Sequence, residues 1–226
     1  IKAYKAAGVN RFSIGLQTGF DEELKRLNRP HTAKDFLLAC NLLKGENVSA
    51  DILIGLHDQT AEEVKKSIDL AIAGGVSHIS MYALTPEVGT PIYTDYLNGE
   101  LLSDDETADI YDEARAYLAE KGFYRYEVSN FAKKGFESRH NLNYWRRGEY
   151  IGCGVAASSF VDGRRFTNTF SIDEYMNAII YNKTPEISSD IIEGEDAEFE
   201  FIMLGLRTEE GISVKKFNET FNADFD

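Results

Sequence analysis

The sequence has few cysteines, few prolines and too little positive charge to balance its acidic residues. Its 226 residues contain two cysteines and four prolines, and 24 lysines and arginines against 38 aspartates and glutamates give a formal net charge of −14. Cys40 and Cys153 are too few for a disulfide framework, and neither belongs to a Cys-x-x-Cys pair of the kind that binds metals. We therefore predict a cytoplasmic chain that holds no metal ligands of its own.

The acidic balance and the hydrophobic pattern exclude two kinds of partner. A pI near 4.8 argues against nucleic acid and anionic membrane surfaces, which are themselves negative. No apolar run reaches the roughly 18 residues that a membrane span requires, and no signal peptide opens the sequence. The first residue is Ile1, at the tail of an expected helix, which predicts that the natural N-terminus lies upstream.

The first part of the chain alternates strands and helices. β-Branched and aromatic runs predict strands at 11–17, 48–54 and 77–84, and helices are expected at 32–44 and 60–73. Strand–helix–strand units of about 30 residues imply parallel strands joined by right-handed crossovers. Three parallel strands are too few to close a barrel, so we predict the second half of an α/β barrel.

Alternation along the first two strands separates an apolar face from a polar one. Ile14 and Leu16 point one way, whereas Ser13, Gln17 and, on the second strand, Asp51 point the other way. Parallel sheets rarely leave a face open, so the polar face predicts a cavity that holds a ligand. The alternative is a sheet whose polar face meets solvent.

The second part of the chain mixes helices with short strands. A loop marked by proline and glycine precedes a helix from Ser103, which has the capping-box spacing with Glu106. We expect a half-buried strand at 124–132 and a hairpin at 154–168 that turns at Asp162-Gly163.

The expected elements divide the chain into three parts. Residues 1–100 form the half-barrel, and residues 101–194 form a smaller α+β domain that includes a short helix at 171–182. Residues 195–226 form a helix, a turn and a second helix, the start of a winged-helix-like subdomain that is truncated at the end of the sequence. The fold class is therefore α/β.

Gln17, Arg29 and Asp51 form the clearest candidate binding site. Gln17 and Asp51 lie on the polar face, and Arg29 follows the first strand, on the side where α/β barrels hold their ligands. An arginine pairs with a carboxylate, and an aspartate accepts from hydroxyls or an ammonium, so the three suit a zwitterion that carries a ribose. The alternative is a structural salt bridge between Arg29 and Asp51.

The stretch RHNLNYWRRGEYIGCG gathers aromatic and basic side chains. His140 suits three roles: a metal ligand, a base or a hydrogen-bonded core histidine. Tyr144 and Trp145 are expected to form a flat aromatic wall, either as core packing or as a platform for a planar ligand. Arg146 and Arg147 suit the carboxylates of such a ligand, and the whole mixture suits a porphyrin.

Five segments, in this order, resemble one family of proteins. They are GVNRFSIGLQTGFDEELKRLNRPHT, SADILIGLHDQT, HISMYALTPEVGTPIY, YEVSNFA and RHNLNYWRRGEYIGCG. Together they are similar to the radical S-adenosylmethionine (SAM) proteins related to oxygen-independent coproporphyrinogen III oxidase. Within that family the HNLNYW segment resembles the His-Asn-x-x-Tyr-Trp signature of the heme chaperone branch.

The resemblance implies a partial, TIM-like α/β barrel in which a four-iron four-sulfur cluster cleaves SAM to a radical. The family's SAM contacts would fall on Gln17, Arg29 and Asp51, with a further contact around Leu84 or Thr85. The cluster motif Cys-x-x-x-Cys-x-x-Cys is absent from this chain. The resemblance therefore places the cluster ligands outside the chain, and the chain alone is expected to be inactive.

Two positions depart from the family pattern. The usual Gly-Leu-Pro-Gly-Gln-Thr reads GLHDQT here, with His57 and Asp58. Where relatives often carry Ala-His-Ser, this chain has Ser158 in place of the histidine, which weakens the carry-over of any porphyrin-handling role at that position.

The heme chaperone branch implies a protein that binds heme with its later domain and delivers it to an acceptor protein. The residues implied for heme or substrate are His140, Asn141, Tyr144 and Trp145. The alternative is an oxidase that decarboxylates the propionate side chains of coproporphyrinogen III to give protoporphyrinogen IX. The HNLNYW segment favours the chaperone.

Overall fold

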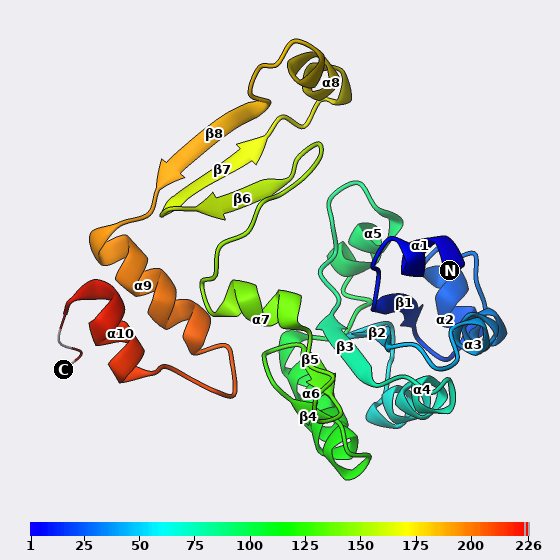
Figure 1. Ribbon diagram of the computed structural model, residues 1–226. Coiled ribbons are helices and arrows are strands. Elements are labelled where there is room, and N and C mark those ends of the chain that lie inside the picture. The colour runs from blue at the N-terminus through cyan, green and yellow to red at the C-terminus, as the bar shows by residue number, and fades with distance from the viewer. Residues whose placement is uncertain (224, 226) are drawn as a thin grey trace. The chain divides into compact units, whose positions relative to one another are not determined.

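The computed structural model describes residues 1–223 and 225, which form two compact units (Figure 1). The units are Ile1–Glu137 and Ser138–Asp226. Residues 101–137, which we expected in a second domain, fall within the first unit. The division of the chain into three parts stays a prediction.

The first unit is built on a five-stranded sheet with the strand order β1-β2-β3-β5-β4. The first three strands run parallel, as predicted, and the last two add an antiparallel edge (Figure 1). The strands are β1 (Phe12–Gln17), β2 (Val48–Ile54), β3 (His78–Ala83), β4 (Tyr124–Arg125) and β5 (Asn130–Ala132). The helices of this unit are α1 (Lys2–Ala6), α2 (Asp21–Arg26), α3 (Ala33–Leu42), α4 (Ala61–Ala73), α5 (Pro91–Leu97) and α6 (Asp104–Glu120).

Capping boxes begin the longer helices of the first unit. At α4 the hydroxyl of Thr60 accepts from the backbone N–H of Glu63, and the carboxylate of Glu63 accepts from the backbone N–H of Thr60. Ser103 and Glu106 do the same at α6, and α3 begins in this way at Thr32. Each box pairs N–H groups that the helix itself leaves without partners, so short local sequences set these helix starts.

The apolar face of the sheet is covered by α3, α4 and α6. Leu16, Ala50 and Ile52 are fully buried at this face, as strand parity predicts. Ile68 of α4 and Leu118 of α6 are also fully buried in the same core. Burial of these side chains stabilises the unit and leaves the opposite face of the sheet for polar residues.

Two predictions for the segment between β3 and the second unit are wrong. Residues 124–132 form two short strands, β4 and β5, and the N–H of Tyr126 donates to the carbonyl of Asn130 at 3.1 Å where the chain reverses. The expected loop after β3 contains α5. Pro91 is its first residue, where the missing N–H of proline would have no helical partner in any case.

The second unit contains a three-stranded antiparallel sheet in the order β6-β7-β8. The predicted hairpin is confirmed, because Asp162 and Gly163 have φ values of 50° and 72°, the left-handed values that a tight hairpin turn requires. The elements are α7 (Arg139–Trp145), β6 (Ser158–Val161), β7 (Arg164–Asn168), α8 (Ile172–Ile180), β8 (Glu186–Ile191), α9 (Gly194–Gly205) and α10 (Val214–Phe221).

The helices α8, α9 and α10 confirm three predicted elements, whereas α7 and β8 were not predicted. All residues of β8 except the first are exposed. β8 therefore lacks the alternation of buried and exposed residues from which a strand can be predicted.

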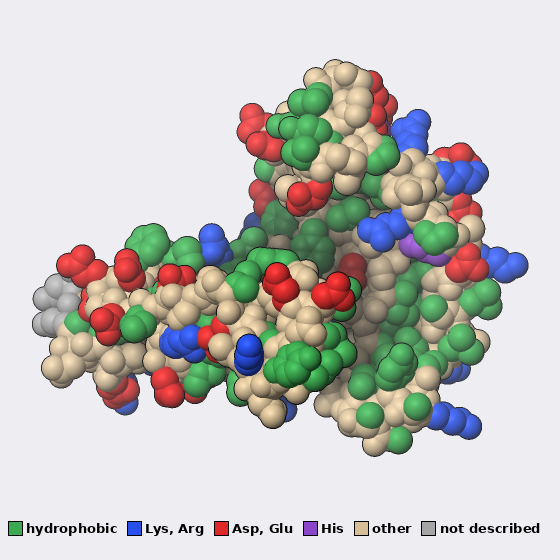
Figure 2. Space-filling model, turned by 90° about the horizontal axis from the view of Figure 1, so that it is seen from above, with side chains coloured by type: hydrophobic (Ala, Val, Ile, Leu, Met, Phe, Trp, Pro, Cys, Tyr) green, Lys and Arg blue, Asp and Glu red, His purple; other side chains and the backbone are tan. Residues whose placement is uncertain are grey.

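The described surface agrees with the acidic composition. Figure 2 shows acidic side chains spread over the visible face, interspersed with single lysines and arginines rather than a continuous basic patch. None of the helices formed by the described residues combines the length and the apolar character of a membrane-spanning segment.

Candidate functional site

Two rows of polar positions cross the sheet of the first unit, on the face opposite the apolar core. Paired residues of neighbouring strands point to the same face, so strand register defines each row. One row joins Ser13, Ser49 and His78. The other joins Gly15, Asp51, Ser80 and Asn130. The polar face predicted from β1 and β2 thus continues to β5.

Gln17 stands at the carboxyl end of β1 and turns back over this polar face. Its φ is 66°, and the register of β1 on β2 shifts between Gly15 and Gln17. A Cβ atom on Gly15 would lie 2.7 Å from Nε2 of Gln17. Glycine at this position therefore leaves the space that the amide fills, beside the Gly15–Asp51 pair.

Asp51 lies at the middle of the polar face. The hydroxyl of Ser13 is 3.1 Å from both of its carboxylate oxygens. The contact that Asp51 makes is with Ser13, and no ion pair among the described residues joins it to Arg29, so the salt bridge that we considered as the alternative is not formed. Arg29 is exposed and follows Asn28, whose φ of 54° turns the chain after α2.

Arg11 supplies positive charge at the same face. Burial lowers the pKa of its guanidinium, and the nearby charges of Tyr126 and Asp51 oppose that shift. The guanidinium donates a hydrogen bond to the carbonyl of Phe136 at 3.1 Å. Arg11 and Asp51 therefore lie close enough on this face to interact electrostatically.

Thr85 lies just beyond the carboxyl end of β3. The preceding residue, Leu84, donates its N–H to the carbonyl of Ile54 at 2.8 Å, which extends the contact between β2 and β3 by one bond. Thr85 itself is exposed. It therefore stands at the same edge of the sheet as Gln17, where parallel strands of α/β folds present their ligand-binding groups.

His78 is a buried residue that hydrogen-bonds two other side chains, and we did not identify it from the sequence. Its Nδ1 is 2.7 Å from the hydroxyl of Ser49, and its Nε2 is 2.8 Å from the hydroxyl of Tyr126. Burial, together with the positive charge of Arg11, lowers the pKa of His78 to about 3. The ring is neutral at ordinary pH. The parity of the third predicted strand, extended from the first two, would have placed it on the polar face.

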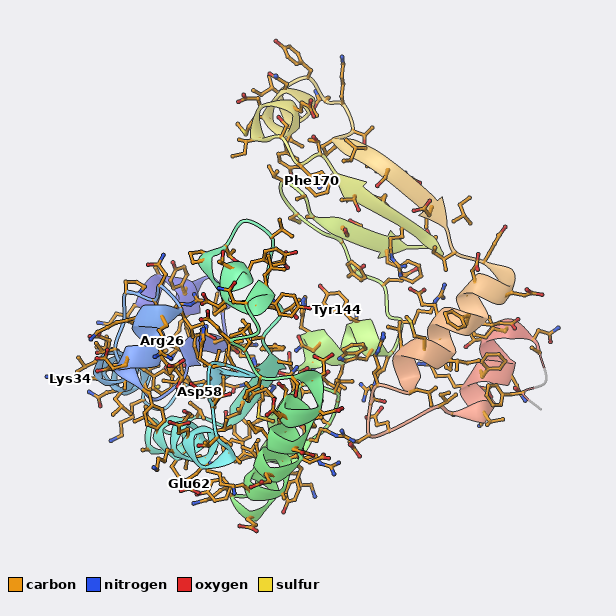
Figure 3. All side chains as sticks on the ribbon, turned by 180° about the vertical axis from the view of Figure 1, so that it is seen from behind. Arg26, Lys34, Asp58, Glu62, Tyr144 and Phe170 are labelled. Atoms are coloured by element: carbon orange, nitrogen blue, oxygen red, sulfur yellow. The ribbon has the colours of Figure 1, made fainter. Side chains whose placement is uncertain are left out.

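The predicted aromatic stretch of the second unit centres on α7. The rings of His140 and Tyr144, one helical turn apart, meet edge to face with centroids 4.6 Å apart. Tyr144 meets Tyr150 in the same manner at 4.7 Å, and Tyr150 contacts Phe160 of β6 at 6.4 Å. Both His140 and Tyr144 are exposed (Figure 3 labels Tyr144). His140 is therefore not the buried core histidine of the alternative.

A cavity of about 370 Å³ lies beside this aromatic row. Tyr144, Tyr150 and Phe160 line it, and Ser158 lies in its wall with its hydroxyl 2.9 Å from that of Thr167. Ser158 is the position at which the family pattern often has a histidine. The cavity therefore lies at the two sequence segments that the resemblance connects with porphyrins.

The arginines of this stretch are paired within the protein, which corrects the expectation that they are open to ligand carboxylates. Arg147 donates to Glu200 at 2.8 Å, and Arg165 donates to the same carboxylate at 2.5 Å. Arg146 forms a forked pair with Glu210. Such pairs neutralise the guanidinium groups, so a ligand would have to compete with glutamates for them.

The expected wall of Tyr144 and Trp145 is also wrong. Adjacent helix positions point about 100° apart, and the two rings line different cavities. Trp145 lies at a cavity of about 160 Å³ with Phe201, and the guanidinium of Arg207 is 5.9 Å from the centroid of its ring. Asn141 is partly buried at the first turn of α7, where its N–H donates to Ser138 at 3.4 Å.

The two cysteines are far from a cluster-binding arrangement. Cys40 is buried within α3, and Cys153 is exposed. A four-iron four-sulfur cluster needs several thiolate ligands at one place. The cysteines of this chain do not fit such a cluster.

Comparison with known proteins tests the family resemblance. Residues 1–71 match the radical SAM superfamily, and residues 192–226 match the HemN C-terminal domain. The resemblance to radical SAM proteins is confirmed. Radical SAM similarity implies SAM and a four-iron four-sulfur cluster as cofactors, although this chain does not supply the cluster ligands.

Two curated relatives are heme chaperones. The chain is 33% identical to the heme chaperone HemW of Bacillus subtilis, over 100% of this chain and 61% of that protein. It is 36% identical to HemW of Escherichia coli, over 88% of this chain and 53% of that protein. The chain thus spans between 53% and 61% of the length of these two relatives.

A solved radical SAM structure confirms the fold class. Coproporphyrinogen III oxidase (HemN) from Escherichia coli superposes with a TM-score of 0.79, over 98% of this chain and 55% of that one. The sequence identity is 16%, so this similarity is evidence for the fold alone. It agrees with a mixed α/β unit that corresponds to part of a TIM-like barrel.

Proposed function

We propose that the polar face of the first unit binds SAM through Gln17, Arg29, Asp51 and Thr85. The observation that carries the proposal is the row Gly15–Asp51–Ser80–Asn130, beside the folded-back amide of Gln17. SAM presents an ammonium, a carboxylate and a ribose. Asp51 and Gln17 of this face would supply a matching carboxylate and amide, and Arg29, exposed after α2, would supply a guanidinium.

A buried acceptor on the same row supports the fit. Asn130 is 4% exposed, and its Oδ1 has no hydrogen-bond partner among the described residues. A buried polar atom without a partner costs free energy, which a bound donor would relieve. In this proposal Asp51 accepts from SAM hydroxyls or its ammonium, Arg29 pairs with its carboxylate, and Gln17 and Thr85 position it.

The exchange Asp51→Asn is expected to weaken SAM binding about 10- to 100-fold, because a hydrogen bond to an ionised group contributes roughly 1.5–3 kcal/mol. The measurement is equilibrium SAM binding by calorimetry, in a polypeptide that contains this chain together with cluster-binding cysteines and a reconstituted cluster. Asp109→Asn, an exposed site on α6, serves as the control and should bind SAM normally. Equal affinity of the Asp51→Asn and Asp109→Asn variants would show that Asp51 is structural.

We further propose that the second unit binds heme and that the complete protein delivers it to an acceptor protein, as a heme chaperone of the cytoplasm. Full-length similarity of this chain to curated heme chaperones supports the proposal. So does the aromatic row from His140 to Phe160, which borders the cavity of about 370 Å³. A row of aromatic rings that is exposed at Tyr144, with the imidazole of His140 at its end, suits a flat apolar macrocycle and its iron.

The neighbouring residues of α7 have supporting roles in this proposal. Tyr144 contacts the ring, and His140 supplies a nitrogen at its edge. Asn141 lies at the start of the same helix. Trp145 supports the site by lining a cavity with residues of α9 and α10, and it does not form a flat wall with Tyr144.

Titration of the 226-residue chain with heme tests this proposal. A Soret band that saturates is expected, and His140→Ala should weaken binding about tenfold or more if its nitrogen ligates the iron. His31→Ala is the control, because His31 lies in the first unit and contacts the carbonyl of Leu16. A His140→Ala variant with unchanged heme affinity and spectrum would contradict the assignment of this residue.

The oxidase is the second candidate, since the fold of HemN is compatible with it. The polypeptide with a reconstituted cluster is therefore incubated anaerobically with coproporphyrinogen III and SAM. Formation of protoporphyrinogen IX would favour the oxidase over the chaperone, and heme binding without such turnover would favour the chaperone.

A further inference from the structure

A histidine and two carboxylates meet beside the loop that follows β2. The ligand atoms of His57, Asp95 and Glu100 all lie within 4.8 Å of one another, and Nε2 of His57 is 3.0 Å from Oδ2 of Asp95. We propose that these three side chains bind a divalent transition-metal ion of the Zn²⁺ type. The proposal goes beyond SAM and heme binding and rests on neither.

The backbone of the loop holds His57 in place. The side-chain oxygen of Gln59 accepts from the N–H of Gly55 at 2.9 Å, and the Gln59 amide donates to the carbonyl of Leu53 at 3.2 Å. Asp58 has a φ of 46°, which turns the chain directly after His57. His57 stands where the sequence departs from Gly-Leu-Pro-Gly-Gln-Thr, so this chain places a ligating side chain on a loop that otherwise has none there.

Nε2 is the nitrogen of the imidazole ring that faces Asp95. The His57 side chain is 11% exposed, and its Nδ1, which is buried with no hydrogen-bond partner among the described residues, is not the ligand atom. Zinc binds nitrogen and oxygen ligands at about 2.0–2.2 Å, which puts two ligands of a tetrahedral ion about 3.3 Å apart. The 3.0 Å between His57 and Asp95 is close to that spacing.

Glu100 is the third ligand and the adjustable one. It is exposed, and the amide of Asn98 donates to its Oε1 at 3.1 Å. An exposed glutamate can rotate to bring an oxygen within bonding distance. The hydrogen bond from Asn98 is of the kind that typically orients a ligating carboxylate. Three protein ligands leave a fourth position for water.

The electrostatic surroundings favour a cation. The three ligands lie at the wall of a cavity of about 670 Å³ that Asp58 and Glu106 also line. Arg26 reaches the same cavity, but it is paired with Glu23 at 3.0 Å (Figure 3 labels Arg26 and Asp58). Carboxylates therefore outnumber the one guanidinium at this cavity, and a divalent ion would offset the excess negative charge.

A metal at this site would connect the loop after β2 to α5 and to the segment that follows α5. His57 follows β2, Asp95 belongs to α5, and Glu100 follows α5. We predicted no metal ligands from the sequence, because these residues come from positions about 40 apart rather than from a ligand-spacing motif. The fold brings them together.

Calorimetric titration of the 226-residue chain with ZnCl₂ tests the proposal. One equivalent is expected to bind, and His57→Ala and Glu100→Gln should each weaken the affinity at least about tenfold. His31→Ala, which removes an imidazole outside the proposed site that contacts the carbonyl of Leu16, is the matched control and should leave the affinity unchanged.

A second measurement separates loss of the site from loss of the fold. Zn²⁺ should raise the thermal unfolding temperature of the wild type and of His31→Ala but not that of His57→Ala, with circular dichroism spectra of the three chains alike without metal. Zinc binding to His57→Ala with wild-type affinity, or no binding to the wild type, would overturn the proposal.

Discussion

Acidification from about pH 7 to about pH 4.5 is expected to cost this protein roughly 2–3 kcal/mol of folding free energy through His78 alone. In the unfolded chain the imidazole takes up a proton below its ordinary pKa of 6.5, whereas burial keeps the pKa of the folded ring at about 3. The unfolded state therefore binds more protons between these two values, and stability falls as the pH falls. The physical cause is the burial of the ring between Ser49 and Tyr126 beside the positive charge of Arg11.

Urea unfolding at the two pH values measures this loss. The variant His78→Gln keeps a polar side chain but cannot gain a proton, so its stability should fall by roughly 2–3 kcal/mol less than that of the wild type over the same interval. Because carboxylates contribute equally to both proteins, the difference isolates His78. Parallel pH profiles for His78→Gln and the wild type would mean that the buried ring does not resist protonation.

Gly152→Ala is expected to destabilise the second unit by about 2–3 kcal/mol, at the upper end of the usual cost of overpacking. A Cβ atom on Gly152 would lie 2.2 Å from the carbonyl oxygen and 2.9 Å from the carbonyl carbon of Ser158. These are backbone atoms of β6 and cannot rotate away. The N–H of Gly152 also donates to the hydroxyl of Ser159 at 2.9 Å, so displacement of either segment breaks this contact.

The same displacement would reach the proposed heme site. Tyr150 and Phe160 exchange two backbone hydrogen bonds of 2.9 Å across this point, and both rings line the cavity beside α7. The Gly152→Ala variant should therefore lose heme affinity together with stability.

Gly148→Ala is a matched control for the clash. Its Cβ atom would also lie 2.2 Å from another atom, but that atom is Oδ1 of the Asn143 side chain. The side chain can rotate at the cost of its hydrogen bond to the carbonyl of Glu149, about 1 kcal/mol. Urea unfolding should therefore show a clearly smaller loss for Gly148→Ala. Equal losses of unfolding free energy in the two variants would show that the rigidity of the Ser158 backbone is not what makes Gly152→Ala destabilising.

Features set by local sequence were predictable. The capping residues Thr60 and Ser103 and the turn at Asp162-Gly163 act through bonds within a few residues, so their patterns identify them directly. Strand parity on β1 and β2 identified the buried face and placed Gln17 and Asp51 opposite it, because the two-residue period of a strand does not depend on its neighbours.

Features set by tertiary contacts were not predictable. Whether Arg146 and Arg147 face a ligand depends on Glu210 and Glu200, which are more than fifty positions away in the chain. The sequence also gave no sign that 139–145 is a helix, and that helix is what separates Tyr144 from Trp145. The meeting of His57 with Asp95 likewise depends on where α5 packs.

The central claim is that heme binds at α7 and the neighbouring strands of the second unit, and hydrogen exchange of the 226-residue chain with and without heme tests it most directly. Amides in residues 139–150 and 158–166 are expected to exchange more slowly when heme is bound, because the ligand would cover the cavity that these segments line. Amides in 12–54 should exchange at the same rate. Bound heme that protects only the first unit, or leaves 139–150 unchanged, would contradict the account.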